Sequence, residues 1–105
     1  MKEITVSELK QKIDKGENFQ LIDVREPHEY DLVNIGGELI PVGSIFNSTD
    51  KISTVKDVII YCRSGSRSGA VIMELEKRHG YTNLYNLKGG ILAYAREIDN
   101  SLPVY

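Results

Sequence analysis

Short runs of apolar and β-branched residues along the chain predict the strands of a sheet. Residues 58–61 read Val-Ile-Ile-Tyr, a pattern typical of a central parallel strand that is covered on both faces. Residues 19–24 form a second compact apolar run, and residues 84–87 form a third. Residues 4–6 predict a short first strand, and residues 39–42 predict a short extended piece.

Capping residues and helix breakers predict short helices in the first half of the chain. Ser7 is the expected N-cap of a helix that runs to about Lys15 and stops at Gly16. Pro27 suits the first turn of a short helix, where its missing N–H donor is not needed. Residues 44–53 predict a helical turn followed by a loop.

Two further helices are predicted in the second half of the chain. The first follows a polar segment and runs to His79, where Gly80 ends it. Its inward-facing positions are Val71, Ile72 and Leu75. Gly89 and Gly90 predict a turn that allows close packing, and residues 91–98 predict a last helix. A phosphate loop is not expected there, because no lysine-serine signature follows the glycines.

The alternation of strands and helices in so short a chain predicts an α/β fold with a mostly parallel sheet. Ligands of such sheets bind at the carboxyl ends of the strands. Two strand ends qualify, at residues 19–24 and 58–61, because an unusually charged loop follows each of them. The first of these loops contains the charged cluster from Asp23 to Glu29.

The composition limits the number of domains and the classes of partner. The 105 residues fit one domain, residues 1–105. Hydrophobic residues make up 41% of the chain and charged residues 27%, as in an ordinary globular protein. The formal net charge is −2, from 13 basic and 15 acidic residues, so no global positive field favours nucleic acid or an anionic membrane.

The chain has one cysteine, Cys62, which excludes an internal disulfide and a zinc site of several cysteines. His28 and His79 have no partner at ligand spacing, so no metal site is expected. The first residues lack the apolar stretch of a signal peptide, and no apolar run approaches the roughly 20 residues of a membrane helix. A cytoplasmic location is therefore expected.

The segment after Cys62 is the most informative part of the sequence. Its six residues are all arginine, serine or glycine, namely Arg63, Ser64, Gly65, Ser66, Arg67 and Ser68. A loop that leads into a helix presents amide N–H groups to an anion, and the helix dipole lowers the pKa of a thiol. The arginines add positive charge, and the glycine lets several N–H groups point inward. The segment predicts a cup of donors around one sulfur atom.

Other interpretations of Cys62 imply other chemistry. A buried structural cysteine predicts apolar neighbours, which this segment lacks. Cysteine-type phosphatases use a His-Cys-x5-Arg loop, in which the arginine chelates two phosphate oxygens. Here the interval is Cys62-x4-Arg67, and Tyr61 stands in place of the histidine. The smaller ring favours a single sulfur over a phosphate or arsenate ester.

Three segments, in order along the chain, resemble the rhodanese-like domain family. Residues 21–30, Leu-Ile-Asp-Val-Arg-Glu-Pro-His-Glu-Tyr, are similar to its DVR-x-x-x-E-[YF] segment. Residues 58–68 are similar to its active-site strand and loop, in the six-residue form used by sulfurtransferases. Residues 86–94, Asn-Leu-Lys-Gly-Gly-Ile-Leu-Ala-Tyr, are similar to its closing L-x-GG-x-x-x-W segment. Together they span nearly the whole chain.

The resemblance implies a five-stranded parallel sheet flanked by helices, with Cys62 as the nucleophile that forms a persulfide. It further implies that the amides of residues 63–68 cradle the sulfur, that Arg25 lies near the pocket and that Asp23 braces it. The residues alone leave alternatives open. Arg25 could pair with a neighbouring glutamate at the surface, and Asp23 could cap the adjacent loops.

The chain departs from the family pattern at two places. Residues 34–38 read Asn-Ile-Gly-Gly-Glu where the family often has His-Ile-x-Gly-Ala, and Tyr94 replaces the usual tryptophan of the last segment. Both positions are usually structural, so we expect altered packing rather than lost chemistry. Residues 34–41 also resemble the rhodanese domains that are fused to activating enzymes of the molybdopterin and thiamine pathways.

The expected function is that of a monomeric sulfurtransferase without a cofactor. Cys62 takes a sulfane sulfur from thiosulfate or a protein persulfide and passes it to a thiol, cyanide or a sulfur-carrier acceptor. Two rivals remain: an arsenate reductase or phosphatase, and a non-catalytic binding or redox-sensing module. Nucleic acid is not an expected partner, because the six scattered tyrosines form no stacking platform.

Overall fold

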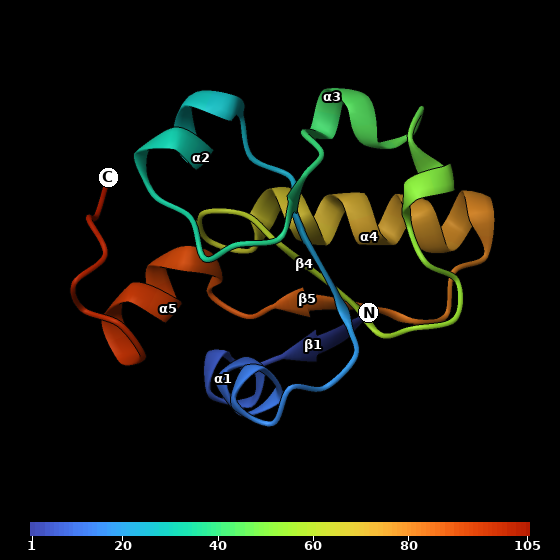
Figure 1. The fold of residues 1–105 in the computed structure, drawn as a ribbon. Helices are drawn as coiled ribbons and strands as arrows, with labels where there is room; N and C mark the ends of the chain where they lie inside the picture. Colours follow the sequence, from blue (N-terminus) through green and yellow to red (C-terminus); the bar gives the residue numbers. More distant parts are fainter.

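The computed structural model describes residues 1–105 and contains one five-stranded sheet (Figure 1). In sheet order, the strands are β1 (Lys2–Ile4), β5 (Leu84–Leu87), β4 (Val58–Tyr61), β2 (Gln20–Asp23) and β3 (Glu38–Leu39). Every neighbouring pair is parallel. The predicted α/β fold with helices around a five-stranded sheet is confirmed, and the sheet is parallel throughout.

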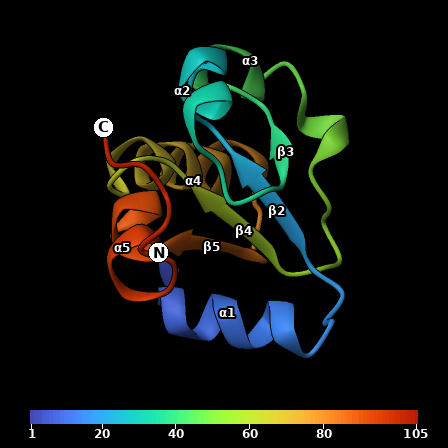
Figure 2. The same ribbon diagram turned by 60° about the vertical axis from the view of Figure 1, so that its left-hand side comes forward.

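Helices cover both faces of this sheet (Figure 2). One face carries α1 (Val6–Asp14) and α5 (Gly90–Glu97). The other face carries α4 (Ser66–His79) and the short α3 (Val42–Ile45). The remaining elements are the short α2 (Pro27–Leu32) and the 3₁₀ turn η1 (Thr49–Lys51). None of the helices combines the length and the apolar character that a membrane span requires.

The central strand β4 separates two hydrophobic clusters, one on each face of the sheet. Val58 and Ile60 belong to the cluster that contains residues of α3 and α4, and Cys62 follows them on the same side. Ile59 and Tyr61 belong to the cluster that contains residues of α1 and α5. All five residues are completely buried, because helices cover both faces of the strand. The backbone position of Cys62 is therefore fixed by the buried strand that precedes it.

The first helix begins two residues earlier than the sequence pattern suggested. Strand β1 ends at Ile4, and Thr5 rather than Ser7 is the N-cap of α1. The side chain of Thr5 accepts a hydrogen bond from the amide of Glu8 at 3.1 Å, and the carboxylate of Glu8 accepts one from the amide of Thr5 at 2.9 Å. This reciprocal capping box satisfies two amides, whereas Ser7 has no glutamate three residues later.

Most other predicted elements are confirmed, with small shifts of their ends. β4 and β5 have the predicted limits, and α4 ends at His79, where Gly80 follows with a φ of 69°. The extended piece predicted over residues 39–42 is shorter, because β3 ends at Leu39 and Val42 already belongs to α3. Pro41 is the N-cap of α3, and it leads the chain out of the sheet.

The carboxyl ends of β2, β4 and β5 meet at one edge of the sheet (Figure 2). Asp23 at the end of β2 pairs with Tyr61 at the end of β4, and β5 pairs with β4 on the other side. The segments that follow these strands begin at Val24, Cys62 and Lys88. They lie side by side, at the edge where parallel sheets bind their ligands.

Candidate active site

The thiol of Cys62 lies where β4 passes into the loop before α4, and the residue has no exposed surface. Its Sγ accepts hydrogen bonds from the amide of Gly65 at 3.1 Å, from the amide of Ser68 at 3.4 Å and from the hydroxyl of Ser68 at 3.3 Å. Gly65 has a φ of 101°, which glycine adopts without the strain of a Cβ atom. The donors around the sulfur are therefore main-chain amides and one hydroxyl.

Two opposing effects act on the pKa of Cys62. Burial raises it, because a low-dielectric environment disfavours the charged thiolate. Hydrogen bonds from the hydroxyl and amide of Ser68 and from the amide of Gly65 lower it, and the nearby amide of Ser64 adds a smaller contribution in the same direction. The hydrogen bonds prevail, and the pKa of the Cys62 thiol lies below its ordinary value. A larger thiolate fraction at neutral pH makes this cysteine a better nucleophile.

Ser68 and Asn86 form a buried polar pair beside the sulfur. Ser68 Oγ lies 2.6 Å from Asn86 Oδ1 and 3.3 Å from Cys62 Sγ. A hydrogen bond of 3.0 Å from Asn86 Nδ2 to the carbonyl oxygen of Gly65 orients the Asn86 amide. The single hydroxyl proton of Ser68 therefore has two acceptors, and a thiolate is the stronger one because it is charged. We expect deprotonation of Cys62 to turn this hydroxyl toward Sγ.

Replacing Ser68 with alanine is expected to raise the pKa of Cys62 by about one unit, since a hydrogen bond to a charged group contributes about 1.5 kcal/mol. The rate of Cys62 alkylation by iodoacetamide, followed against pH, measures this pKa through its midpoint. Ser66→Ala is the matched control, because Ser66 is exposed in the same segment and makes no hydrogen bond to Sγ. A midpoint that stays in place in S68A would mean that the amides alone set the pKa.

Arg63 in the loop and Arg67 in the first turn of α4 have different partners. Arg67 donates hydrogen bonds of 2.7 and 3.0 Å to the two carboxylate oxygens of Glu29 in α2. This pair lowers the pKa of Glu29 to about 2, chiefly through the hydrogen bonds from Arg67. Arg63 forms no ion pair with an Asp or Glu side chain, and its guanidinium donates to the main-chain oxygen of Tyr105. Neither guanidinium is hydrogen-bonded to Sγ.

Arg25, which was expected near the pocket, is completely buried and uses all of its guanidinium donors. Its acceptors are both carboxylate oxygens of Asp23, the carbonyl oxygens of Glu29 and Val33, and the hydroxyl of Tyr105. This burial excludes the alternative of a surface pair with a glutamate. Neither Arg25 nor Asp23 is hydrogen-bonded to Cys62 or to residues 63–68. Arg25 therefore braces the walls around the loop, and a direct contact with substrate stays a prediction.

The first turn of α5 packs directly on the backbone of the loop. The amide of Ile91 donates to the carbonyl oxygen of Cys62 at 3.0 Å, and the amide of Leu92 donates to that of Arg63 at 3.1 Å. Gly90 has a φ of 61°, and a Cβ atom there would lie 2.4 Å from the oxygen of Arg63 and 2.6 Å from that of Cys62. The predicted close packing at the glycine pair is thus confirmed, and it involves the loop of the site.

Packing accommodates the two departures from the family pattern. The hydroxyl of Tyr61, in place of the phosphatase histidine, donates to the carbonyl oxygen of Gly36 at 2.9 Å and accepts from the amide of Ile35 at 3.4 Å. The tyrosine thereby holds the unusual segment 34–38 against β4. Tyr94 is 8% exposed and belongs to the cluster between the sheet and α1 and α5.

Three residues of the site were not singled out from the sequence: Glu29 as a partner of Arg67, Asn86 and Tyr105. Asn86 carries a usable signal, because it is a polar residue inside an otherwise apolar strand, and it is 4% exposed. Glu29 and Tyr105 contact each other across 76 positions of sequence. No local pattern predicts such a contact.

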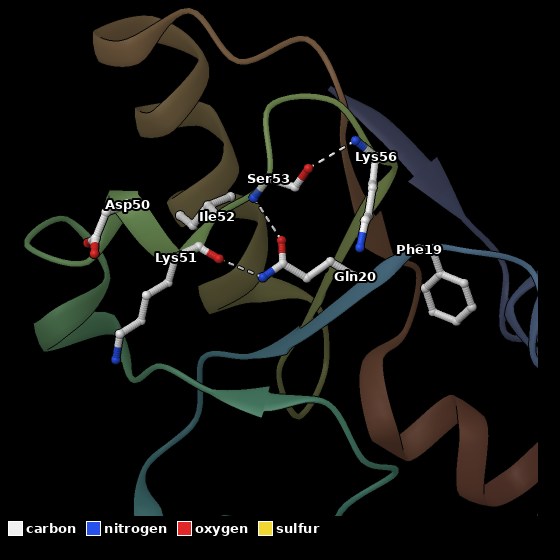
Figure 3. A pocket seen from close by; sticks show the side chains of 7 residues that line it. All are labelled: Phe19, Gln20, Asp50, Lys51, Ile52, Ser53 and Lys56. Atoms are coloured by element: carbon white, nitrogen blue, oxygen red, sulfur yellow. Dashed lines mark hydrogen bonds between the residues drawn. The ribbon is translucent and has the colours of Figure 1, made fainter.

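A pocket of about 370 Å³ lies at the other end of the sheet, beside the start of β2 (Figure 3). Gln20 spans one side of it, donating to the carbonyl oxygen of Lys51 at 2.7 Å and accepting from the amide of Ser53 at 2.8 Å. The hydroxyl of Ser53 accepts in turn from the amide of Lys56 at 2.9 Å. These polar groups hold the loop between η1 and β4 in place, and Cys62 lies at the opposite edge of the sheet.

The sequence is similar to a family model and to proteins that are named as sulfurtransferases. Residues 5–97 match the family described as Rhodanese-like domain. A sulfurtransferase of Allochromatium vinosum is 35% identical over 108 residues, which cover 97% of this chain and 92% of that protein. The probable adenylyltransferase/sulfurtransferase MoeZ of Mycobacterium tuberculosis is 36% identical over 106 residues. These cover 97% of this chain, but this chain spans only 26% of MoeZ.

The fold also matches solved structures. A rhodanese-like domain protein from Staphylococcus aureus has a TM-score of 0.83 at 29% identity, with 100% of this chain and 99% of that chain covered. The sheet order, the loop around Cys62 and the sequence match over residues 5–97 lead to the same result. The chain belongs to the rhodanese-like domain family.

Proposed function

We propose that the protein is a sulfurtransferase that carries a sulfane sulfur as a persulfide on Cys62. The observation that carries this proposal is the environment of Sγ, which receives hydrogen bonds from two amides and one hydroxyl. These donors favour the thiolate over the thiol, and they are held in place because they belong to the short loop after β4 and to the first turn of α4. The sulfur-transfer names of its relatives support the same reaction class.

The reaction follows from the chemistry of a thiolate and a sulfane sulfur. With thiosulfate as donor, the thiolate of Cys62 attacks the outer sulfur, a new S–S bond forms, and sulfite leaves with the electron pair of the broken S–S bond. The product is Cys62–S–S⁻, whose negative charge the amides of the loop stabilise. A nucleophile such as cyanide then attacks the terminal sulfur, leaves as thiocyanate and restores the thiolate.

The physiological donor and acceptor are proposed by chemical class. The donor is thiosulfate or the persulfide of another protein, and the acceptor is a thiol, cyanide or a sulfur-carrier protein. One relative, from Bacillus subtilis, is named as a putative sulfur carrier protein, YrkF, and is 31% identical over 90 residues. That name favours a sulfur relay between proteins. No cofactor takes part in either step.

Incubation with thiosulfate followed by intact-mass measurement tests the proposal. The protein is expected to gain the mass of one sulfur atom, and cyanide is expected to remove it with release of thiocyanate in equal amount. A protein persulfide serves as the second donor if thiosulfate gives no gain. A chain that accepts sulfur from neither donor, although it is folded and its thiol reacts with iodoacetamide, would refute the proposed function.

A further inference from the structure

Tyr105 joins three side chains around the Cys62 loop, and the proposed sulfur transfer uses none of these contacts. Its hydroxyl accepts a hydrogen bond from Arg25 Nη1 at 2.7 Å and donates one to Glu29 Oε2 at 2.8 Å. Its main-chain oxygen accepts from Arg63 Nε at 2.8 Å and also from Arg63 Nη2. The Tyr105 ring lies 5.1 Å from Arg63 Cζ and 5.7 Å from Arg25 Cζ, within the range of cation–π attraction.

Tyr105 makes the polar contacts that join the end of the segment after α5 to the rest of the site, while Leu102 packs against the hydrophobic cluster of that face. Residues 103–105 make no main-chain to main-chain hydrogen bond, and Leu102 makes a single one, of 3.3 Å, to Asp99. Val104 is 73% exposed. The segment runs from α5 past the start of α4 toward α2 (Figures 1 and 2). The hydroxyl and ring of Tyr105 contact Arg25, Glu29 and Arg63, and without them only the main-chain oxygen at position 105 still contacts Arg63. We expect loss of that side chain to weaken the attachment of the segment to the loop.

The three arginines around the site differ in how their charge is balanced. Arg25 is paired with Asp23, and Arg67 is paired with Glu29. Arg63 has no carboxylate side chain as partner, and its only hydrogen-bond acceptor is the main-chain oxygen of Tyr105. Arg63 directly follows Cys62 and is partly exposed. It is therefore the arginine whose charge becomes available to an anion when Tyr105 moves away.

We propose that Tyr105 is a specificity-determining residue that competes with small anionic sulfur donors for Arg63. The proposal rests on the sulfurtransferase function proposed above. Cys62 has no exposed surface, so a donor reaches Sγ only after a covering group moves. While Tyr105 occupies Arg63, an anion such as thiosulfate must displace it, and the apparent affinity falls with the fraction of molecules in which Arg63 is free.

Replacing Tyr105 with alanine is therefore expected to lower the KM for thiosulfate about fivefold, because a larger fraction of the molecules is competent to bind. The kcat should change much less, since the residues that surround the sulfur are untouched. Tyr105→Phe removes only the hydroxyl contacts with Arg25 and Glu29, and it should give a smaller decrease in KM. Val104→Ala is the matched control in the same segment, and its KM should equal that of the wild type.

Alkylation of Cys62 provides a test that does not depend on sulfur transfer. Iodoacetate is anionic and iodoacetamide is neutral, and both report access to the same sulfur. We expect Tyr105→Ala to raise the rate with both reagents and to raise the ratio of the iodoacetate rate to the iodoacetamide rate. In the double variant with Arg63→Gln, the iodoacetamide rate should stay raised, and the ratio of the iodoacetate rate to the iodoacetamide rate should return to the wild-type value.

The outcomes separate this inference from the proposed function. An unchanged ratio and an unchanged KM in folded Tyr105→Ala and Tyr105→Phe would overturn the role of Tyr105. A raised KM would overturn it too, because the residue would then assist binding of the anion. A raised alkylation ratio without any sulfur loading would support the competition for Arg63 while refuting the sulfurtransferase function.

Discussion

Cys62→Ser is expected to abolish sulfur loading completely. The substitution leaves the amides and the hydroxyl that surround position 62 unchanged. The serine hydroxyl, however, does not ionise at neutral pH and forms no S–S bond with a donor. Cys62 is the only cysteine of the chain, so no second thiol replaces it. After incubation with thiosulfate or a protein persulfide, the intact mass of the variant should stay constant, whereas the wild type gains one sulfur.

The comparison requires that the variant remains folded. Exchange of one buried sulfur for oxygen removes little volume, and we expect it to cost about 1 kcal/mol of unfolding free energy. Thermal melting followed by circular dichroism measures this cost. Ser66→Ala, at the first residue of α4, is the control for a change close to Cys62, and it should load sulfur as the wild type does. Loading of folded C62S would show that the sulfur is bound elsewhere.

The strand and loop around Cys62 were predictable because their determinants are local. The apolar run of β4 needs two covered faces, and the glycine, serine and arginine residues after it do not suit a continuation of the strand. Gly65 adopts a positive φ, and Gly80 ends α4 as expected. The start of the first helix was predicted wrongly, although its determinant is also local. The capping box of Thr5 and Glu8 sets the N-cap, and it is more favourable than a cap by Ser7 alone.

The partners of the arginines were not predictable, because they depend on tertiary contacts. The sequence does not reveal that the Arg25 side chain pairs with Asp23, or that Arg67 pairs with Glu29, which is 38 positions away. The contacts of Tyr105 with Arg25 and Glu29 span 80 and 76 positions. A charged loop at a strand end therefore indicates where a site lies. Which of its charged side chains pair with one another can be learned only from the folded structure.

The residues around the sulfur have two different roles: some hold the surrounding elements in place, and others donate hydrogen bonds to Sγ. Arg25 and Arg67 are neutralised by carboxylates and fix the positions of β2, α2 and α4 relative to one another. Two of the three donors to Sγ are amides, whose placement depends on the course of the backbone rather than on the identity of side chains, and the third is the hydroxyl of Ser68. The backbone of the loop must therefore be held from outside. Asn86 of β5 donates to the carbonyl oxygen of Gly65, and the first turn of α5 donates to the carbonyl oxygens of Cys62 and Arg63.

Gly90→Ala is accordingly expected to damage both stability and sulfur loading. At a φ of 61° a Cβ atom would lie 2.4 Å from the carbonyl oxygen of Arg63, so the loop or α5 must shift. Left-handed backbone with a Cβ costs about 1–2 kcal/mol, and forcing extra volume into a packed site costs about 1–3 kcal/mol. We expect the unfolding free energy to fall by about 3 kcal/mol in urea denaturation, and the rate of sulfur loading to fall with it.

Gly80→Ala separates the two contributions to this loss. Gly80 has a similar φ of 69°, but a Cβ atom there meets nothing within 4 Å. Its substitution should therefore cost only the conformational part, about 1 kcal/mol, and should leave loading at the wild-type rate because it lies at the far end of α4. Equal losses of unfolding free energy in the two variants would mean that the loop and α5 move apart to accommodate the Cβ atom at little energetic cost. A loading defect confined to G90A would show that this contact positions the amides around Cys62.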